Sequence, residues 1–86
     1  MQKLSDLPNI SKVIESKLHE AGIETPEQLN ALGAEQAFLR ISEIDESACI
    51  NMLCALEGAI QNIRWHHLPK ERKEELKHFL NLKKLS

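Results

Sequence analysis

Two cysteines and a pair of adjacent histidines are the residues of this sequence with the most obvious capacity for chemistry. Cys49 and Cys54 are potential nucleophiles or metal ligands, and His66 and His67 are potential bases or ligands. The cysteines lie five residues apart in an apolar run with helical spacing, so their side chains point about 140° apart. We therefore expect both to be buried small hydrophobic residues in a reducing compartment.

The histidine pair lacks the surroundings that a metal site needs. Adjacent side chains diverge, and beyond scattered glutamates no further ligand follows at the usual spacing. The sequence contains no glycine-rich loop or paired-carboxylate motif, and a bundle of 86 residues has little room for a substrate pocket. These patterns predict a protein that is not an enzyme and takes no metal, cofactor or small-molecule substrate.

A second group of residues is suited to contact with a partner. Lys70, Lys73 and Lys77 fall near one face of a C-terminal helix, and Trp65 precedes that helix. The lysines could form a docking surface, with Trp65 as an anchor at an interface. Interleaved glutamates favour a solvated face instead, and a Trp at the end of a buried helix more often closes the core. We favour these two simpler interpretations and keep the docking surface as the alternative.

Charge is distributed unevenly along the chain, whose net charge is −2. Residues 1–63 carry four basic and ten acidic side chains, a net of −6. Residues 64–86 carry seven basic and three acidic side chains, a net of +4. Because proteins that grip a phosphate backbone generally need a basic surface, this distribution disfavours DNA as a partner.

Length and composition predict one globular domain over residues 1–86. Hydrophobic residues make up 42% of the chain and charged residues 28%, as in ordered proteins. Aromatic residues are scarce, so we expect an aliphatic core. The N-terminus does not resemble a signal peptide, and no apolar run approaches the roughly 18 residues of a membrane span. We expect a soluble, cytoplasmic protein.

Capping residues and periodicity mark the first helix. Asn9 and Ser11 are both good N-cap residues, and Gly22 is a typical helix end. Between them an apolar stripe recurs at helical spacing. Its members are Ile10, Val13, Ile14, Leu18 and Ala21.

Two more helices follow. Thr25 is expected to cap a short helix that has Pro26 at its first position and ends at Gly33. Gln28 would close a capping box with Thr25. Residues 34–41 form a further amphipathic stretch with helical spacing.

The longest predicted helix covers residues 48–63 and is apolar on nearly every side, as a central buried helix is. We expect Asp45, in a linker of residues 44–47, to cap it, and Gly58 to permit close approach of another helix. Pro69 opens a last helix. Its inward residues are expected to be Leu76, Phe79, Leu80 and Leu82. The sequence thus predicts an all-α, compact five-helix domain around residues 48–63.

Residues 7–69 resemble the C-terminal domain of the TfoX/Sxy competence-regulator family. Four stretches carry the resemblance: Leu7-Pro8-Asn9-Ile10, Ala21-Gly22-Ile23-Glu24-Thr25 with Leu29, Ala31-Leu32-Gly33-Ala34 with Ala37-Phe38, and Ala55-Leu56-Glu57-Gly58-Ala59-Ile60 with Trp65 and Leu68-Pro69. The resemblance implies a helical fold related to helix-hairpin-helix modules and a link to transcriptional control of DNA uptake. Members of this family look two-domained, and this chain matches the second domain.

The N-terminal part resembles a helix-hairpin-helix motif, in which glycine amides in a tight turn approach a phosphate. This chain has Asn9 and Ser11 where such motifs usually have glycines. Asn9, Ile10, Ser11 and Lys12 are therefore the candidate DNA or phosphate contacts, through backbone amides assisted by the lysine. The alternative, which we favour, is that these residues only cap a helix.

Two functions remain in view. The first is a regulatory or protein-interaction module, with a protein partner or self-association through ends of opposite charge. The second is a weak, sequence-independent DNA binder that uses the turn of Asn9 to Lys12, which the net charge disfavours.

Overall fold

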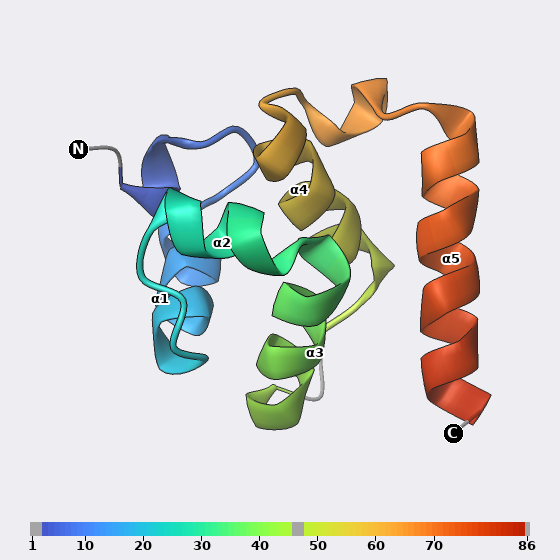
Figure 1. The fold of residues 1–86 in the computed structure, drawn as a ribbon, viewed down its shortest axis with the longest axis horizontal. Coiled ribbons are helices and arrows are strands. Elements are labelled where there is room, and N and C mark those ends of the chain that lie inside the picture. Colours follow the sequence, from blue (N-terminus) through green and yellow to red (C-terminus); the bar gives the residue numbers. More distant parts are fainter. Residues whose placement is uncertain (1–2, 46–47, 86) are drawn as a thin grey trace.

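Five α-helices build the part of the protein that the structure describes, as the sequence predicts (Figure 1). The structure is a computed structural model that describes residues 3–45 and 48–85, within which there is no β-strand. The helices are α1 (Lys12–Glu20), α2 (Pro26–Leu32), α3 (Ala34–Ile44), α4 (Ile50–Gln61) and α5 (Lys70–Leu85). Two 3-10 turns, η1 (Leu4–Asp6) and η2 (Trp65–His67), complete the described elements.

Helix α4 is the centre of the fold, and this prediction is confirmed. Residues 53–59 are buried without interruption, because the helix is apolar on nearly every side. Helices α3 and α5 pack against it, and η2 lies close to its C-terminal end. The helix is two residues shorter at each end than the predicted 48–63. At its C-terminal end Asn62 adopts the left-handed conformation, with φ 60°.

Asp45 does not cap the central helix, so that prediction is wrong. Its backbone N–H donates to the carbonyl of Ile41 at 2.9 Å, which ends α3 three residues beyond the predicted boundary. Its carboxylate pairs with Lys17 of α1. The N-cap of α4 is Cys49, whose side chain makes no capping hydrogen bond. Residues 46–47 of the expected linker lie outside the described residues.

Both ends of α1 follow the sequence signals. The hydroxyl of Ser11 accepts a hydrogen bond from the amide of Ile14 at 3.3 Å, as an N-cap does. Gly22 has φ 87° and follows the helix, and the amide of Ile23 donates to the carbonyl of Leu18 at 2.8 Å. This is the Schellman arrangement, which needs a residue that tolerates positive φ.

One of the two hydrogen bonds predicted at the start of α2 is present. Thr25 accepts from the amide of Gln28 at 3.1 Å, so the N-cap is confirmed. The side chain of Gln28, however, accepts from the amide of Glu24 at 2.6 Å, one residue before the position of a capping box. Gly33, with φ 84°, joins α2 directly to α3.

Two residues predicted to face inward are exposed. Val13 is 65% exposed, because it lies about 100° around α1 from Ile14, which packs on the core. Leu82 is 55% exposed, near the far end of α5. Only the first part of α5 is fully anchored: Leu76 is buried, whereas Phe79 and Leu80 are partly buried. Figure 1 shows α5 in red along one flank of the molecule.

The described helices contain no segment that is both long and apolar enough to cross a membrane. The region before α1 contains the 3-10 turn η1, so the first helix of the helix-hairpin-helix likeness is reduced to a single turn. Leu4 of this turn is fully buried and joins the core cluster. The turn therefore anchors the chain before Asn9 in the core.

Candidate functional site

The candidate phosphate-binding turn directs its asparagine into the protein. Asn9 has φ 71°, in the left-handed region that Asn tolerates. Its side-chain amide donates to the carbonyl of Ile63 at 2.9 Å, and its side-chain oxygen accepts from the amide of Trp65 at 3.2 Å. Both partners lie in the segment after α4. Asn9 thus connects the N-terminal turn to a segment more than fifty residues further along the chain.

The neighbours of Asn9 are also used within the fold. Ile10 is 6% exposed and belongs to the core, and the hydroxyl of Ser11 caps α1. Lys12 is exposed, and it is the one residue of the four whose side chain is free to meet a phosphate. The geometry therefore fits the capped helix start, and phosphate contact at this turn stays a prediction.

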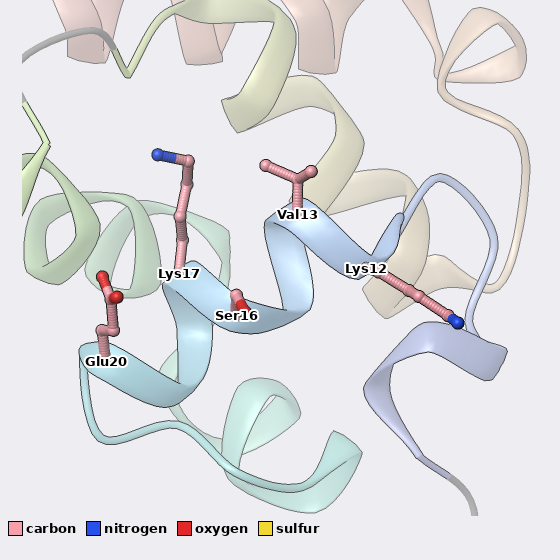
Figure 2. A pocket seen from close by; sticks show the side chains of 5 residues that line it. All are labelled: Lys12, Val13, Ser16, Lys17 and Glu20. Atoms are coloured by element: carbon pink, nitrogen blue, oxygen red, sulfur yellow. The ribbon is translucent and has the colours of Figure 1, made fainter.

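A shallow, open hollow of about 420 Å³ lies along α1. All its lining residues belong to this single helix: Lys12, Val13, Ser16, Lys17 and Glu20. Figure 2 shows that Lys12 and Lys17 point in different directions, and Lys17 is already paired with Asp45. The hollow is therefore a depression in the surface of one helix, and its two lysines do not converge on a common ligand.

Trp65 is not part of the core, so the interpretation that we favoured from the sequence is wrong. The residue is 37% exposed, and its ring stacks on that of His66 with centroids 4.5 Å apart and planes 19° apart. The reason is that α4 ends at Gln61 and the chain turns away at Asn62, which places Trp65 beyond the helix. Whether Trp65 binds a partner stays a prediction.

The three lysines of the candidate docking surface differ in their surroundings. Lys70 and Lys77 are exposed on α5. Lys73 is half-buried, and its amino group donates to the carbonyl of His66 at 3.2 Å. Lys73 therefore holds the η2 turn against α5, in addition to lying on the basic face.

Gly58 permits a close approach, as predicted, but the approaching groups are not on another helix. A Cβ atom at this position would lie 2.5 Å from the Asn9 side-chain nitrogen and 2.8 Å from the Ile63 carbonyl oxygen. It would also lie 3.2 Å from the Cα atom of Trp65. The bare glycine therefore makes room for the contact between Asn9 and the segment after α4.

A buried ion pair was not predicted from the sequence. Glu57, in the middle of α4, is only 7% exposed. One of its carboxylate oxygens accepts from Arg72 of α5 at 2.8 Å, and the other accepts from Gln61. Arg72 also donates to Glu35 of α3 at 2.9 Å and lies 3.5 Å from Glu75. These contacts tie α3, α4 and α5 together.

Burial and hydrogen bonding act in opposite directions on this pair. Burial raises the pKa of Glu57, but hydrogen bonds from Arg72 and Gln61 outweigh it and leave the pKa of the carboxyl lowered. Hydrogen bonds to Glu57 and Glu35 raise the pKa of Arg72. Both groups are therefore charged at neutral pH, and each stabilises the charge of the other.

One signal in the sequence could have revealed this pair. Glu57 is a charged residue inside the apolar run that becomes residues 53–59 of α4. A buried carboxylate needs a charged or hydrogen-bonding partner, so its position alone calls for a cation nearby. The sequence gives no means to choose Arg72 from the seven basic residues after position 63.

The cysteines do not behave alike. Cys54 is buried, and burial raises the pKa of its thiol. Cys49 is exposed, so the expectation that both are buried is wrong for this residue, which lies just outside the first turn of α4. Among the described residues no group of three or more Cys, His, Asp or Glu side chains is arranged to hold a metal ion.

The sequence as a whole can be compared with known families. The family model described as the TfoX C-terminal domain matches residues 1–80. The chain belongs to this family. A curated relative, protein Sxy of Escherichia coli, is 39% identical over 75 residues, which are 87% of this chain and 36% of Sxy. The chain therefore spans about a third of the length of that TfoX-family relative.

Two solved structures share the fold of this TfoX C-terminal domain. An uncharacterised protein from Listeria monocytogenes, in a triclinic crystal form, is 55% identical and superposes with a TM-score of 0.90, covering 91% of this chain and 89% of its own. A protein of unknown function from the same organism, in a tetragonal form, is also 55% identical, with a TM-score of 0.87 and coverage of 90% and 95%. Neither description assigns a function.

Proposed function

We propose that this chain is a non-enzymatic regulatory module, of the kind found in TfoX-type competence regulators, that acts by associating with another protein. Membership of the TfoX C-terminal family and the match to Sxy support the regulatory part of the proposal. The proposal takes residues 1–86 as one domain that functions inside the cytoplasm.

One observation carries the preference for a protein partner over DNA. The polar side chains of the turn that would contact phosphate serve the fold, since Asn9 bonds to Ile63 and Trp65 and Ser11 caps α1, which leaves Lys12 as the one side chain of the four that could assist the backbone amides. Net charge points the same way, because residues 1–63 carry a net charge of −6 and would repel a phosphate backbone. The exposed Trp65, with Lys70, Lys73 and Lys77 following it, is the proposed association surface.

The second candidate is a weak DNA binder, and the exposure of Lys12 beside the turn favours it. Backbone amides at the start of α1 could then hold a phosphate, with the lysine nearby. Such binding would be sequence-independent and would weaken steeply as salt rises.

One experiment separates the two candidates. The purified protein is titrated into labelled double-stranded DNA at low salt, and its mass in solution is measured in parallel. The proposal expects no saturable binding. Saturable binding that fades with salt and is lost in Lys12→Glu, but kept in Lys77→Glu, would overturn the proposal in favour of the DNA binder.

A further inference from the structure

The segment from Ile63 to His66 is held in place from two sides. The Asn9 side chain bonds to the carbonyl of Ile63 at 2.9 Å and to the amide of Trp65 at 3.2 Å. From the other side Lys73 donates to the carbonyl of His66 at 3.2 Å. Three backbone groups of one short segment are thereby fixed by a residue from the turn before α1 and by a residue of α5.

This arrangement requires particular residue types at particular positions. Asn9 and Asn62 both adopt positive φ, at 71° and 60°, which is unfavourable for residues with a Cβ atom. Gly58 leaves no room for a Cβ, which would lie 2.5 Å from the Asn9 side chain. The path of this segment is therefore defined by specific residues at three positions, and not merely by the way the chain reaches α5.

Little of the surface of this fixed segment is buried. No residue of η2 is buried, and Trp65 remains 37% exposed, stacked on His66. A large aromatic side chain on a fixed backbone offers contact area to a partner at a small cost in conformational entropy. Trp is also among the residue types most enriched at the energetic centres of interfaces.

The charge around Trp65 indicates what kind of partner fits. Between Arg64 and Lys70 the sequence has no acidic residue, and it includes His66 and His67. Arg64 and Lys70 are exposed, whereas Arg72 is occupied by Glu57 and Glu35. Two exposed basic residues that flank Trp65 in the sequence suit a short acidic segment, while the acidic remainder of the chain disfavours a long phosphate backbone.

We propose that Trp65 and His66, with Arg64 and Lys70, form a docking surface for an acidic segment of another protein that carries a bulky apolar side chain. Asn9 is a positioning residue for this surface, since it fixes the backbone on both sides of Arg64. The inference rests on the proposed function, because it names the chemistry of the protein partner.

The chain offers a direct optical readout, because Trp65 is its single tryptophan. A phage-displayed library of random peptides is selected on the immobilised protein, and tryptophan-free binders are synthesised. We expect the selected peptides to combine Asp or Glu with Leu, Ile or Phe, to change the fluorescence of Trp65, and to bind more weakly as salt rises.

Variants then locate the binding. Trp65→Ala and, on an exposed residue, Lys70→Glu should each weaken the selected peptide at least about tenfold. Val13→Ala, at a residue that is 65% exposed on α1, should leave the affinity unchanged. Lack of enrichment, enrichment of basic peptides, or equal binding by Lys70→Glu and wild type would overturn the proposal.

Asn9→Gly tests the positioning role separately. Glycine accepts the positive φ of this turn but removes both hydrogen bonds. We expect unchanged helical content by circular dichroism, faster local motion of Trp65 in time-resolved fluorescence anisotropy, and weaker peptide binding. Unchanged affinity with unchanged Trp65 motion would show that Asn9 has no positioning role.

The outcomes also distinguish this inference from the proposed function beneath it. Peptides that bind wild type and Lys70→Glu equally, without a change in Trp65 fluorescence, would move the interface elsewhere and leave the protein-interaction module intact. A mass that doubles with concentration and returns to monomer in Lys70→Glu would replace the separate partner with a second copy of this chain. Binding of DNA through Lys12 with no selected peptide would overturn both.

Discussion

Two contacts fasten distant segments to α4 or to the chain that directly follows it, and they use different chemistry. Just beyond the C-terminal end of the helix, Asn9 bonds to the backbone of Ile63 and Trp65 through an uncharged amide. In the middle of the helix, the carboxylate of Glu57 binds the guanidinium of Arg72. The first contact joins a side chain to backbone groups, whereas the second joins two side chains. Substitution can therefore remove both partners of the ionic contact but only one partner of the neutral contact.

The difference matters because a buried group without its partner lowers the free energy of unfolding by more than the intact pair adds to it. Glu57 is 7% exposed, so an unpaired carboxylate there would remain largely without water. Asn9 is half-buried, and the backbone groups that it leaves can be reached by solvent more easily. We expect the ionic contact to be the more sensitive to single substitutions and the more tolerant of paired ones.

The largest effect is expected for Arg72→Met. It leaves Glu57 buried without its cation, which should lower the free energy of unfolding by about 3–5 kcal/mol. The double variant Glu57→Leu/Arg72→Met removes both charges and should recover most of that loss. Urea denaturation measures both, with Lys77→Met as an exposed control on the same helix. A loss below about 1 kcal/mol for Arg72→Met would show that the pair behaves like a surface ion pair.

Substitutions of Asn9 are expected to come next. Asn9→Gly keeps the backbone conformation and loses two hydrogen bonds, which should cost about 1–3 kcal/mol. Asn9→Ala loses the same bonds but, unlike the glycine variant, keeps a Cβ at φ 71°, so it should be about 1–2 kcal/mol less stable than Asn9→Gly. The difference between the two variants isolates the backbone conformation. Equal stabilities would mean that the turn relaxes to negative φ when the side chain is removed.

Gly58→Ala tests how closely the neutral contact is packed. Alanine favours a helix over glycine by up to about 1 kcal/mol, but its Cβ would lie 2.5 Å from Asn9 and 2.8 Å from the carbonyl of Ile63. Overpacking of this kind costs about 1–3 kcal/mol, so we expect a net loss of stability. In an Asn9→Gly background the penalty should shrink, because one of the close contacts is gone. A stabilising Gly58→Ala would contradict the close approach.

Most of the fold could be predicted because its signals are local. The N-caps at Ser11 and Thr25, the glycine after α1 and the apolar run of α4 act within one or two turns of the chain. The failures at the end of α3 and the start of α4 have a tertiary cause. Asp45 looks like a cap in sequence, but in the fold its carboxylate pairs with Lys17, 28 residues away.

The contacts made by α4 and by the chain directly after it could not be predicted from local sequence signals, for the same reason. Asn9 could be recognised as a turn residue, but its partners Ile63 and Trp65 are backbone groups 54 and 56 residues further on. A sequence pattern does not show which backbone groups will bond to a distant side chain, because nearly every residue type carries the same backbone groups. The prediction of a buried Trp65 is wrong because the position of this residue relative to the end of α4 depends on where Asn62 turns the chain. Sequence spacing defines the faces of a helix, but not the direction in which the chain leaves it.

The response to pH is the smallest expected difference between the two contacts, and it distinguishes them most directly. The pKa of Glu57 is lowered from its ordinary 4.5, although burial alone would raise it, because the hydrogen bonds from Arg72 and Gln61 outweigh the burial. As pH falls, the unfolded chain therefore binds a proton at this carboxyl before the folded protein does. The stabilisation from Glu57 is present above about pH 4.5 and is lost as pH falls through the lower pKa of the folded state.

Denaturation from pH 7 to pH 3 measures this contribution in wild type, Glu57→Gln and Asn9→Gly. We expect Glu57→Gln to lose part of the decline below about pH 4.5, since its side chain cannot titrate there. Asn9→Gly should be less stable than wild type by the same amount at every pH, because an amide has no charge to gain or lose. If Glu57→Gln keeps the full decline, other acidic residues cause the pH dependence, and the ionic and the neutral contact do not differ in this respect.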